Sequence, residues 1–171
     1  HDLGNLNFSF IADKKIYDVK KQMQVIQKAL LNFNLETEVS GRNDITYQGR
    51  KFSGNAFAKT KYQGLHHGTI LIKTDGERLQ KYLKVKPAKL HKHGVKSVAS
   101  RVINLSEVAE ITSENIIPHL IKAFEEVYQG TATIINFNDL CNEEAIKLSQ
   151  KISSDEYLFG KWKEFHTNKS E

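Results

Sequence analysis

Residues 40–69 constrain the fold of this chain more than any other part of the sequence. They contain two strand-like segments, Ile45–Tyr47 and Lys51–Phe57, joined at Gln48-Gly49 in the pattern of a β-hairpin. A third strand-like segment follows at Gly68–Lys73. Small residues and glycines let a backbone approach a ligand closely, and a lysine beside such a turn can place a positive charge on an anionic group. The segment therefore predicts an anion-binding pocket on a hairpin.

The composition describes an ordinary globular domain. The chain has 171 residues, of which 39% are hydrophobic and 26% charged, enough to bury a core without disulfides. The single cysteine, Cys141, fits a reducing compartment, so we expect the cytoplasm or, in a eukaryotic cell, a mitochondrial or other organellar matrix. No stretch approaches the ~20 apolar residues of a membrane span, and residues 1–10 lack the features of a signal peptide. We expect no membrane partner.

The net charge is +5, and the basic residues concentrate in Lys81–Lys96, which contains no acidic residue. A nucleic-acid site would interleave aromatic residues with the basic ones, and only Tyr82 is present there. We therefore expect no nucleic-acid partner. A solvated basic loop and a loop that steers an anionic ligand both remain open.

Hydrophobic periodicity predicts the remaining elements. We expect an α+β domain with a mixed, largely antiparallel sheet flanked by helices. On the helix that we expect to end at Gln129, the inward-facing residues are expected to be Ile117, Leu120, Ile121, Phe124 and Tyr128. The expected elements are a strand at Leu6–Phe10, a helix at Lys15–Asn32, a short helix at Gly76–Leu83 capped by Asp75, a loop at Lys84–Ser100, a helix from Thr112 or Ser113 to Gln129, a strand at Thr131–Phe137 and a helix at Asn142–Ile152.

Lys51 is the first candidate for chemistry. If Phe52 points inward on a regular strand, Lys51 faces the other side, where a plain solvent-facing lysine is the alternative to a functional one. The pair Asn43-Asp44 follows Gly41-Arg42 and is also typical of a simple turn. Asp44 can instead ligate Mg²⁺, which prefers oxygen donors and often bridges to phosphates.

The histidines and the cysteine give weaker signals. His66 and His67 are adjacent, so on a strand only one of them can enter a site on a given face. His91 and His93 have metal-binding spacing but no third ligand nearby, which favours a solvated loop. Cys141 has no recognisable base beside it, which favours an incidental thiol over a nucleophile. No Walker loop, HExxH or CxxC motif is present.

Several separated motifs stand in the chain, in the order His1–Asn5, Ser40–Asp44, Arg50–Ala56, His66–Thr69, Gly94–Val98 and Arg101–Leu105. With these motifs the chain resembles the lipoate–protein ligase family over nearly its whole length, to about Gly160. The resemblance implies a catalytic domain of the biotin/lipoate ligase type. It also implies an enzyme that activates lipoate with ATP as lipoyl-adenylate and then transfers the lipoyl group to a lysine of a lipoyl domain. The implied cofactors are ATP and Mg²⁺, and the implied partners are E2 subunits of 2-oxoacid dehydrogenases or glycine cleavage H protein.

The resemblance also assigns roles to residues. By the family pattern Lys51 is the catalytic lysine, which contacts the lipoyl carbonyl and the phosphate, and fixed positive charge suits the charge that develops there. Asn43 and Asp44 are expected near the nucleotide, with Asp44 as the metal ligand. The other residues expected to bind substrate or adenylate are Asn5, Ser53, Gly54, Asn55, Ala56, His67, Gly68 and Thr69. Lys84–Lys96 corresponds to the family's adenylate-covering loop.

The chain departs from the family pattern at two places. Members carry an Arg-Arg and triple-Gly stretch before the His-Asp pair at which this chain starts. We therefore expect an N-terminally incomplete catalytic domain at residues 1–160 and a linker toward a missing accessory domain at 161–171. Ala58 stands where many members have an Arg that meets the phosphate. Two alternatives stay open: a lipoyl or octanoyl transferase that uses a pre-activated donor, and a non-catalytic fragment that binds the acyl ligand.

Overall fold

The computed structural model describes residues 3–78, 101–136, 139 and 142–160. These residues divide into two compact units, His1–Ala132 and Thr133–Glu171. The basic segment Lys84–Lys96 with His91 and His93, the thiol of Cys141, and residues 161–171 lie outside the described residues. The expected boundary at residue 160 stays a prediction.

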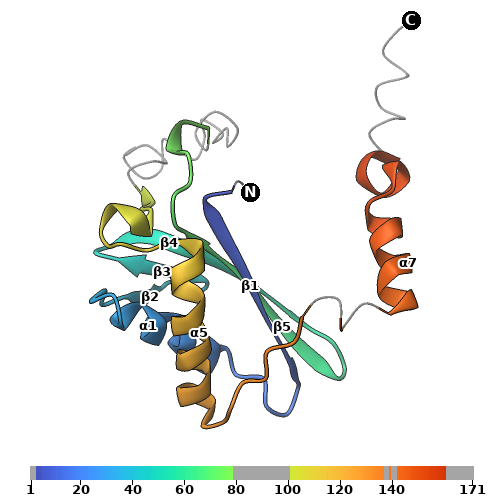
Figure 1. Cartoon of the computed structure of the whole chain (residues 1–171), viewed down its shortest axis with the longest axis horizontal. Coiled ribbons are helices and arrows are strands. Elements are labelled where there is room, and N and C mark those ends of the chain that lie inside the picture. Colours follow the sequence, from blue (N-terminus) through green and yellow to red (C-terminus); the bar gives the residue numbers. More distant parts are fainter. Residues whose placement is uncertain (1–2, 79–100, 137–138, 140–141, 161–171) are drawn as a thin grey trace, which may run out of the picture. The chain divides into compact units, whose positions relative to one another are not determined.

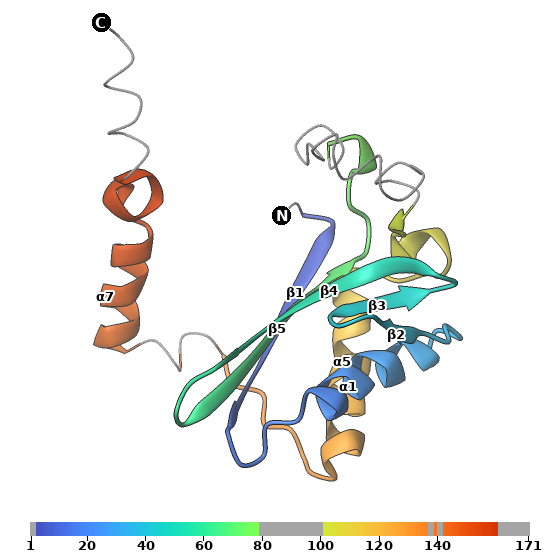
Figure 2. The ribbon, with the colours of Figure 1, turned by 180° about the vertical axis from the view of Figure 1, so that it is seen from behind.

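The first unit is built on a five-stranded sheet in which every neighbouring pair is antiparallel (Figures 1 and 2). The strand order is β1-β5-β4-β3-β2. The predicted α+β class and antiparallel sheet are therefore confirmed. The strands are β1 (Asn5–Asp13), β2 (Glu38–Ser40), β3 (Asp44–Tyr47), β4 (Arg50–Lys59) and β5 (Gln63–Leu71).

The predicted hairpin joins β3 to β4. Its two turn residues, Gln48 and Gly49, have φ angles of 49° and 75°. Two successive left-handed residues match the right-handed twist of the flanking strands, and glycine adopts this conformation without steric cost. Strand β5 begins at Gln63 rather than at the predicted Gly68, so both adjacent histidines lie within the strand.

Helices α1 (Val19–Leu31) and α5 (Ser113–Tyr128) lie on one side of the sheet, as both ribbon views show (Figures 1 and 2). We call this side the helix-covered face and the opposite side the open face. The core between the helices and the sheet includes Met23, Ile26, Leu30, Ile45, Phe52, Ile70 and Ile116, all at most 3% exposed. Burying each such side chain contributes on the order of 1.5–3 kcal/mol, so this layer supplies most of the driving force for folding.

The helix boundaries follow from their caps. Helix α1 begins at Val19, four residues later than predicted, because the Asp18 carboxylate accepts hydrogen bonds from the backbone of Lys20 and Lys21. Thr112 caps α5, which confirms one of the two predicted starts. The Asp75 side chain accepts from the backbone of Glu77 and Arg78, as a helix cap does, and the rest of that predicted helix lies outside the described residues.

Of two predictions about the C-terminal half, one was correct only in part and the other was wrong. Leu120 and Tyr128 pack against the core as predicted, but the fully buried residues of α5 are Ile116 and Ala123, and the predicted Ile117 and Phe124 are 44% and 36% exposed. Residues 131–136 form no strand, although Thr131–Phe137 has β-forming residues. Ile134 and Ile135 are 76% and 56% exposed there, because a strand needs a partner to hydrogen-bond and to bury its side chains.

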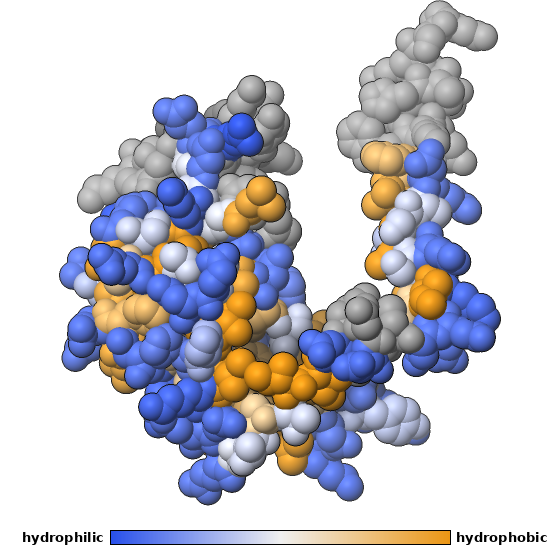
Figure 3. Space-filling view, in the orientation of Figure 1, coloured by the Kyte–Doolittle hydropathy of each residue, from blue (hydrophilic) through white to orange (hydrophobic). Residues whose placement is uncertain are grey.

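The second unit contains the predicted helix, α7 (Glu143–Ile152), which Asn142 caps by accepting from the Ala145 backbone. Apolar side chains lie exposed along it among hydrophilic ones (Figure 3). Ile146, Leu148 and Ile152 are 47%, 59% and 43% exposed. Within the part of the chain that the structure describes, no helix has the length and apolar character needed to cross a membrane.

Candidate active site

Lys51 and Asp44 form an ion pair on the open face. The Lys51 ammonium lies 2.7 Å from Oδ1 of Asp44, and the two side chains are 39% and 35% exposed. A pair at this exposure contributes only about 0–1 kcal/mol to stability, because solvent screens it. The ion pair instead holds the positive charge of the Lys51 ammonium at a fixed position on the sheet.

A β-bulge at Phe52 decides which residues of β4 share that face. In the register Ile45 is opposite Ser53 and Thr46 is opposite Lys51, so Phe52 has no partner of its own. Phe52 and Ser53 are both fully buried at 0% exposure. The extra residue inverts the alternation after it, and Gly54 therefore joins Lys51 on the open face.

The inversion corrects the expected orientation of two site residues. A regular strand would direct Ser53 and Asn55 to the same side as Lys51. Instead Ser53 is 0% exposed and Asn55 5% exposed, and their side chains hydrogen-bond to each other on the helix-covered face. The side chains of these two residues therefore do not line the open face, and any contact with a ligand from here would use their backbone.

Gly54 provides the space that the lysine occupies. A Cβ atom at this position would lie 2.9 Å from Nζ and 3.0 Å from Cε of Lys51. Thr69 is directly opposite Gly54 on β5, and its hydroxyl lies beside the same point. The absence of a side chain at residue 54 thus lets the lysine lie flat across the strand toward Asp44.

Asn43 holds the start of β3 against β4. Its carbonyl accepts from the backbone N–H of Asn55 at 2.8 Å and from the Asn55 side chain at 3.1 Å. The Asn43 side chain donates in return to the Asn55 carbonyl at 3.0 Å. Because Asp44 is the next residue, these three hydrogen bonds fix the position of the backbone from which its side chain extends.

Strands β5 and β1 complete the open face. His67 is opposite Ala56 on one side and Ser9 on the other, and its Nδ1 lies 3.0 Å from the Ser9 hydroxyl. Asn5 donates to the Asn7 side chain at 3.0 Å, and Asn7 is opposite Thr69. Asn7 and Ser9 were not predicted as site residues, although their alternation with the partly buried phenylalanines of β1 is the signal that would have found them.

The neighbouring histidine, His66, points the other way. It is 0% exposed and packs among Phe8, Phe10 and Phe57, with ring centroids 5.4, 5.5 and 4.7 Å from its own. Burial, together with the charge of nearby His67, lowers the pKa of His66 to about 4. The imidazole is therefore neutral at neutral pH. The structure brings one histidine of the pair to the open face and buries the other, as the strand geometry predicted.

Arg50 anchors a distant segment beside Lys51. Its Nε and Nη2 donate to the Val102 carbonyl at 3.1 and 2.8 Å, and Nη2 lies 3.6 Å from the Glu107 carboxylate. The N–H of Ile103 donates to the Lys51 carbonyl at 3.0 Å. The side chain of Asn104 then exchanges two hydrogen bonds of 2.9 Å with the backbone of Thr74.

Ala58 lies exposed on β4, opposite Leu65. The next residue, Lys59, directs its ammonium to the ring of Tyr17, 5.2 Å from the centroid. Tyr17 also fills the space beside Gly64, the partner of Lys59 in the register. Lys59 therefore does not take the place of the arginine that many family members have at the position of Ala58.

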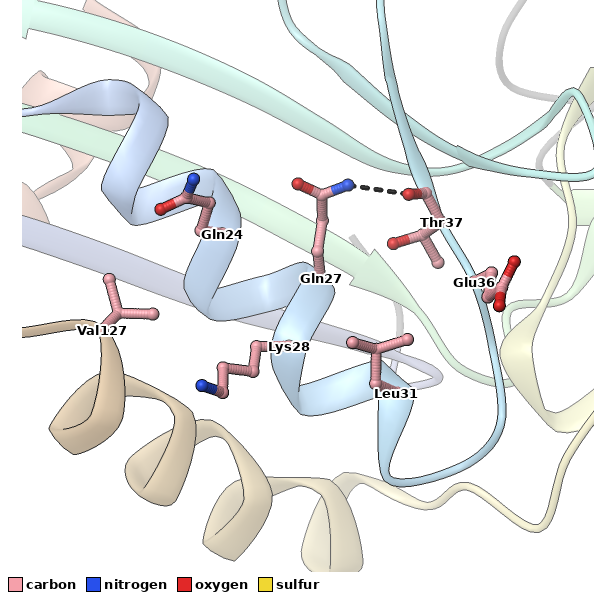
Figure 4. Close-up of a pocket in the computed structure, with 7 residues that line it drawn as sticks. All are labelled: Gln24, Gln27, Lys28, Leu31, Glu36, Thr37 and Val127. Carbon is pink, nitrogen blue, oxygen red and sulfur yellow. Dashed lines mark hydrogen bonds between the residues drawn. The ribbon is translucent and has the colours of Figure 1, made fainter.

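A groove of about 630 Å³ lies elsewhere, between α1 and the segment that leads into β2 (Figure 4). It is lined by Gln24, Gln27, Lys28, Leu31, Glu36, Thr37 and Val127. Two of its polar side chains are paired, since Gln27 donates to the Thr37 carbonyl at 2.7 Å and Lys28 lies 2.8 Å from Glu126. Because none of the residues with candidate chemistry lines it, the candidate active site is the open face of the sheet and not this groove.

The sheet, its one-sided helix layer and the open-face lysine define a catalytic domain of the biotin/lipoate ligase fold. Biotin protein ligase from Aquifex aeolicus shares this fold with a TM-score of 0.52, at 16% identity over 74% of this chain and 53% of its own. The model of the lipoyl protein ligase A/B catalytic domain matches residues 1–125. The chain belongs to this family.

The relatives agree with this assignment. The lipoate–protein ligase A of Bdellovibrio bacteriovorus is 38% identical over 177 residues, which cover 96% of this chain and 51% of that protein. The chain spans about half the length of the curated relatives it matches.

Solved structures of the family superpose well. Plasmodium falciparum LipL1 in complex with lipoate has a TM-score of 0.74 and 36% identity over 94% of this chain and 47% of its own. A lipoate–protein ligase A bound with ATP has a TM-score of 0.73 and 22% identity, over 92% and 66%. The bipartite ligase of Thermoplasma acidophilum, described with its E2 lipoyl domain, has a TM-score of 0.75 and 24% identity, over 92% and 64%.

Proposed function

We propose that this chain is the catalytic domain of an ATP-dependent lipoate–protein ligase. In the first step a lipoate carboxylate oxygen attacks the α-phosphorus of ATP, and the bond to pyrophosphate breaks. In the second step a lysine amine of a lipoyl domain attacks the acyl carbon, AMP leaves, and the amine loses a proton. The acceptors are lipoyl domains of E2 subunits or H protein.

One observation carries this proposal: the Lys51 ammonium lies across Gly54 on the open face, 2.7 Å from Asp44. Both steps develop negative charge on oxygens around phosphorus and the acyl carbonyl. A cation held in place beforehand stabilises that charge without reorganising. The relatives solved with lipoate and with ATP support the choice of substrates.

We propose Asp44 as a protein ligand for the Mg²⁺ ion of this reaction. No group of three or more His, Cys, Asp or Glu side chains converges in the described ranges. Mg²⁺ is commonly bound through one or two carboxylates together with substrate phosphates, so Asp44 would serve as a protein ligand beside the nucleotide. When bound, the ion would neutralise phosphate charge.

The experiment is pyrophosphate release by the complete protein with lipoate and ATP. Release that requires both substrates supports the ligase. If pyrophosphate is not released but lipoyl-adenylate supplied from outside is transferred to a lipoyl domain, the protein is a transferase instead. Binding without either reaction identifies a non-catalytic module.

A further inference from the structure

A buried histidine–asparagine pair lies directly behind the open-face site. Nε2 of His66 is 2.8 Å from Oδ1 of Asn55, and Nδ1 of His66 is 3.2 Å from Oε1 of Gln22 on α1. His66 and Gln22 are 0% exposed and Asn55 is 5% exposed. Breaking such a buried hydrogen bond is costly, because leaving either partner unpaired in the interior costs about 1–3 kcal/mol.

The hydrogen bonds of Asn55 determine which nitrogen of His66 carries the proton. The Asn55 amide nitrogen donates to the Asn43 carbonyl and to the Ser53 hydroxyl, so its oxygen must accept from His66. The proton is therefore on Nε2, and Nδ1 accepts. The Gln22 amide nitrogen is buried without a hydrogen-bond partner in the described structure, and a half-turn of this amide would let it donate to Nδ1.

Strand β5 leaves room for this pair at Gly68, which is opposite Asn55 in the register. A Cβ atom at Gly68 would lie 2.4 Å from the Asn55 amide oxygen and 2.3 Å from Cζ of Phe8. The amide thus fits between the imidazole and a strand without a side chain. The surrounding phenylalanine rings fix the imidazole in turn.

We propose that His66 is a positioning residue that acts through Asn55 on the Asn43–Asp44 segment. His66 orients the Asn55 amide, Asn55 holds the Asn43 carbonyl, and Asn43 sets the place where the Asp44 carboxylate meets Lys51. The catalytic consequence rests on the proposed ligase function. A shift of the charged pair by about 1 Å is enough to lower turnover by about a hundredfold.

Two variants of similar polarity separate this role from general packing. In His66→Gln the amide nitrogen takes the place of Nε2 and can still donate to Asn55. In His66→Asn the shorter side chain reaches only the Nδ1 position, toward Gln22. We expect His66→Asn to lower kcat for pyrophosphate release by about tenfold to a hundredfold, and His66→Gln to recover at least half of the wild-type value. The KM for ATP should change less than kcat in both.

Ile116→Val serves as the control, because Ile116 is equally buried in the same core but makes no polar contact with the site. It should leave kcat unchanged. Equal kcat in folded His66→Gln and His66→Asn variants would overturn the positioning role. A wild-type protein that releases no pyrophosphate contradicts the proposed function instead.

A measurement on the wild-type protein tests the pair even if the variants do not fold or the protein is not a ligase. Nitrogen-15 NMR of the histidine rings should show that the ring proton of His66 is on Nε2 and exchanges slowly with solvent. It should also show a coupling across the hydrogen bond between His66 and the Asn55 amide. A proton on Nδ1 at neutral pH would rule the proposal out.

Discussion

Lys51 and Asp44 meet 2.7 Å apart although neither is opposite the other in the sheet. Asp44 is opposite Gly54 and Lys51 is opposite Thr46, so the pair crosses the β3–β4 ladder diagonally. The bulge at Phe52 and the missing side chain at Gly54 together make this diagonal contact possible. The contact places the positive charge over the middle of the open face rather than at its edge.

Replacing Lys51 with Met should separate activity from stability. We expect pyrophosphate release to fall by at least about a hundredfold, because the fixed charge is lost. The free energy of unfolding should change by less than about 1 kcal/mol, since a partly exposed ion pair contributes little. Steady-state kinetics and urea unfolding measure the two quantities.

Lys28→Met is the matched control for that variant. Lys28 forms an ion pair of similar length, 2.8 Å to Glu126, and is 46% exposed, but it lies on α1. It should cost as little stability and leave turnover unchanged. Near-normal turnover in Lys51→Met would remove the basis of the proposed mechanism.

Gly54→Ala should displace the lysine without unfolding the sheet. The new methyl group would meet the flexible end of the Lys51 side chain, which can move, and Gly54 does not need a left-handed backbone. We expect turnover to fall about tenfold or more while the melting temperature changes by only a few degrees. Gly130→Ala, where the added carbon meets open space, should change neither. Full activity in Gly54→Ala would show that the lysine need not lie across residue 54.

Arg50→Lys should destabilise the junction next to Lys51. A lysine cannot reproduce the two hydrogen bonds from one guanidinium to the Val102 carbonyl, so we expect a loss of about 1–2 kcal/mol in the free energy of unfolding. Arg78→Lys, in an ion pair where Arg78 is 76% exposed, should lose less than about 0.5 kcal/mol. Equal losses in the two variants would mean that Arg50 does not anchor the segment. Urea unfolding provides the comparison.

His66 should make stability depend on pH in acid. Its folded pKa is about 4, below the ordinary value of 6.5, so the unfolded chain binds the proton more readily. Stability from this group is therefore complete above pH 6.5 and is lost as the pH falls toward 4, by about 3 kcal/mol in total. His66→Phe, which suits the aromatic surroundings, should lose correspondingly less stability between pH 7 and pH 4. An unchanged pH dependence in this variant would assign the effect to other groups.

Local patterns predicted the hairpin, the antiparallel sheet and the opposite orientation of His66 and His67, because these depend on residues adjacent in sequence. The side-chain orientations of Ser53 and Asn55 could not be predicted in the same way. They depend on an extra residue in β4 relative to β3, which only the pairing of the two strands reveals. The buried face of α5 was predicted only in part for a similar reason, since its packing partners lie on α1 and the sheet.

The paired hydrogen bonds between Thr74 and Asn104 bring together two residues that are 30 positions apart in sequence. The segment that follows β5 and the segment before the Leu105–Glu107 turn are therefore held together at this one pair of residues. The entropy cost of closing a loop between two fixed ends rises by only about 0.6 kcal/mol for each doubling of its length. We therefore expect that exchanging the intervening stretch for one from another family member leaves the strands of the sheet intact, because both of its ends stay fixed by these two hydrogen bonds.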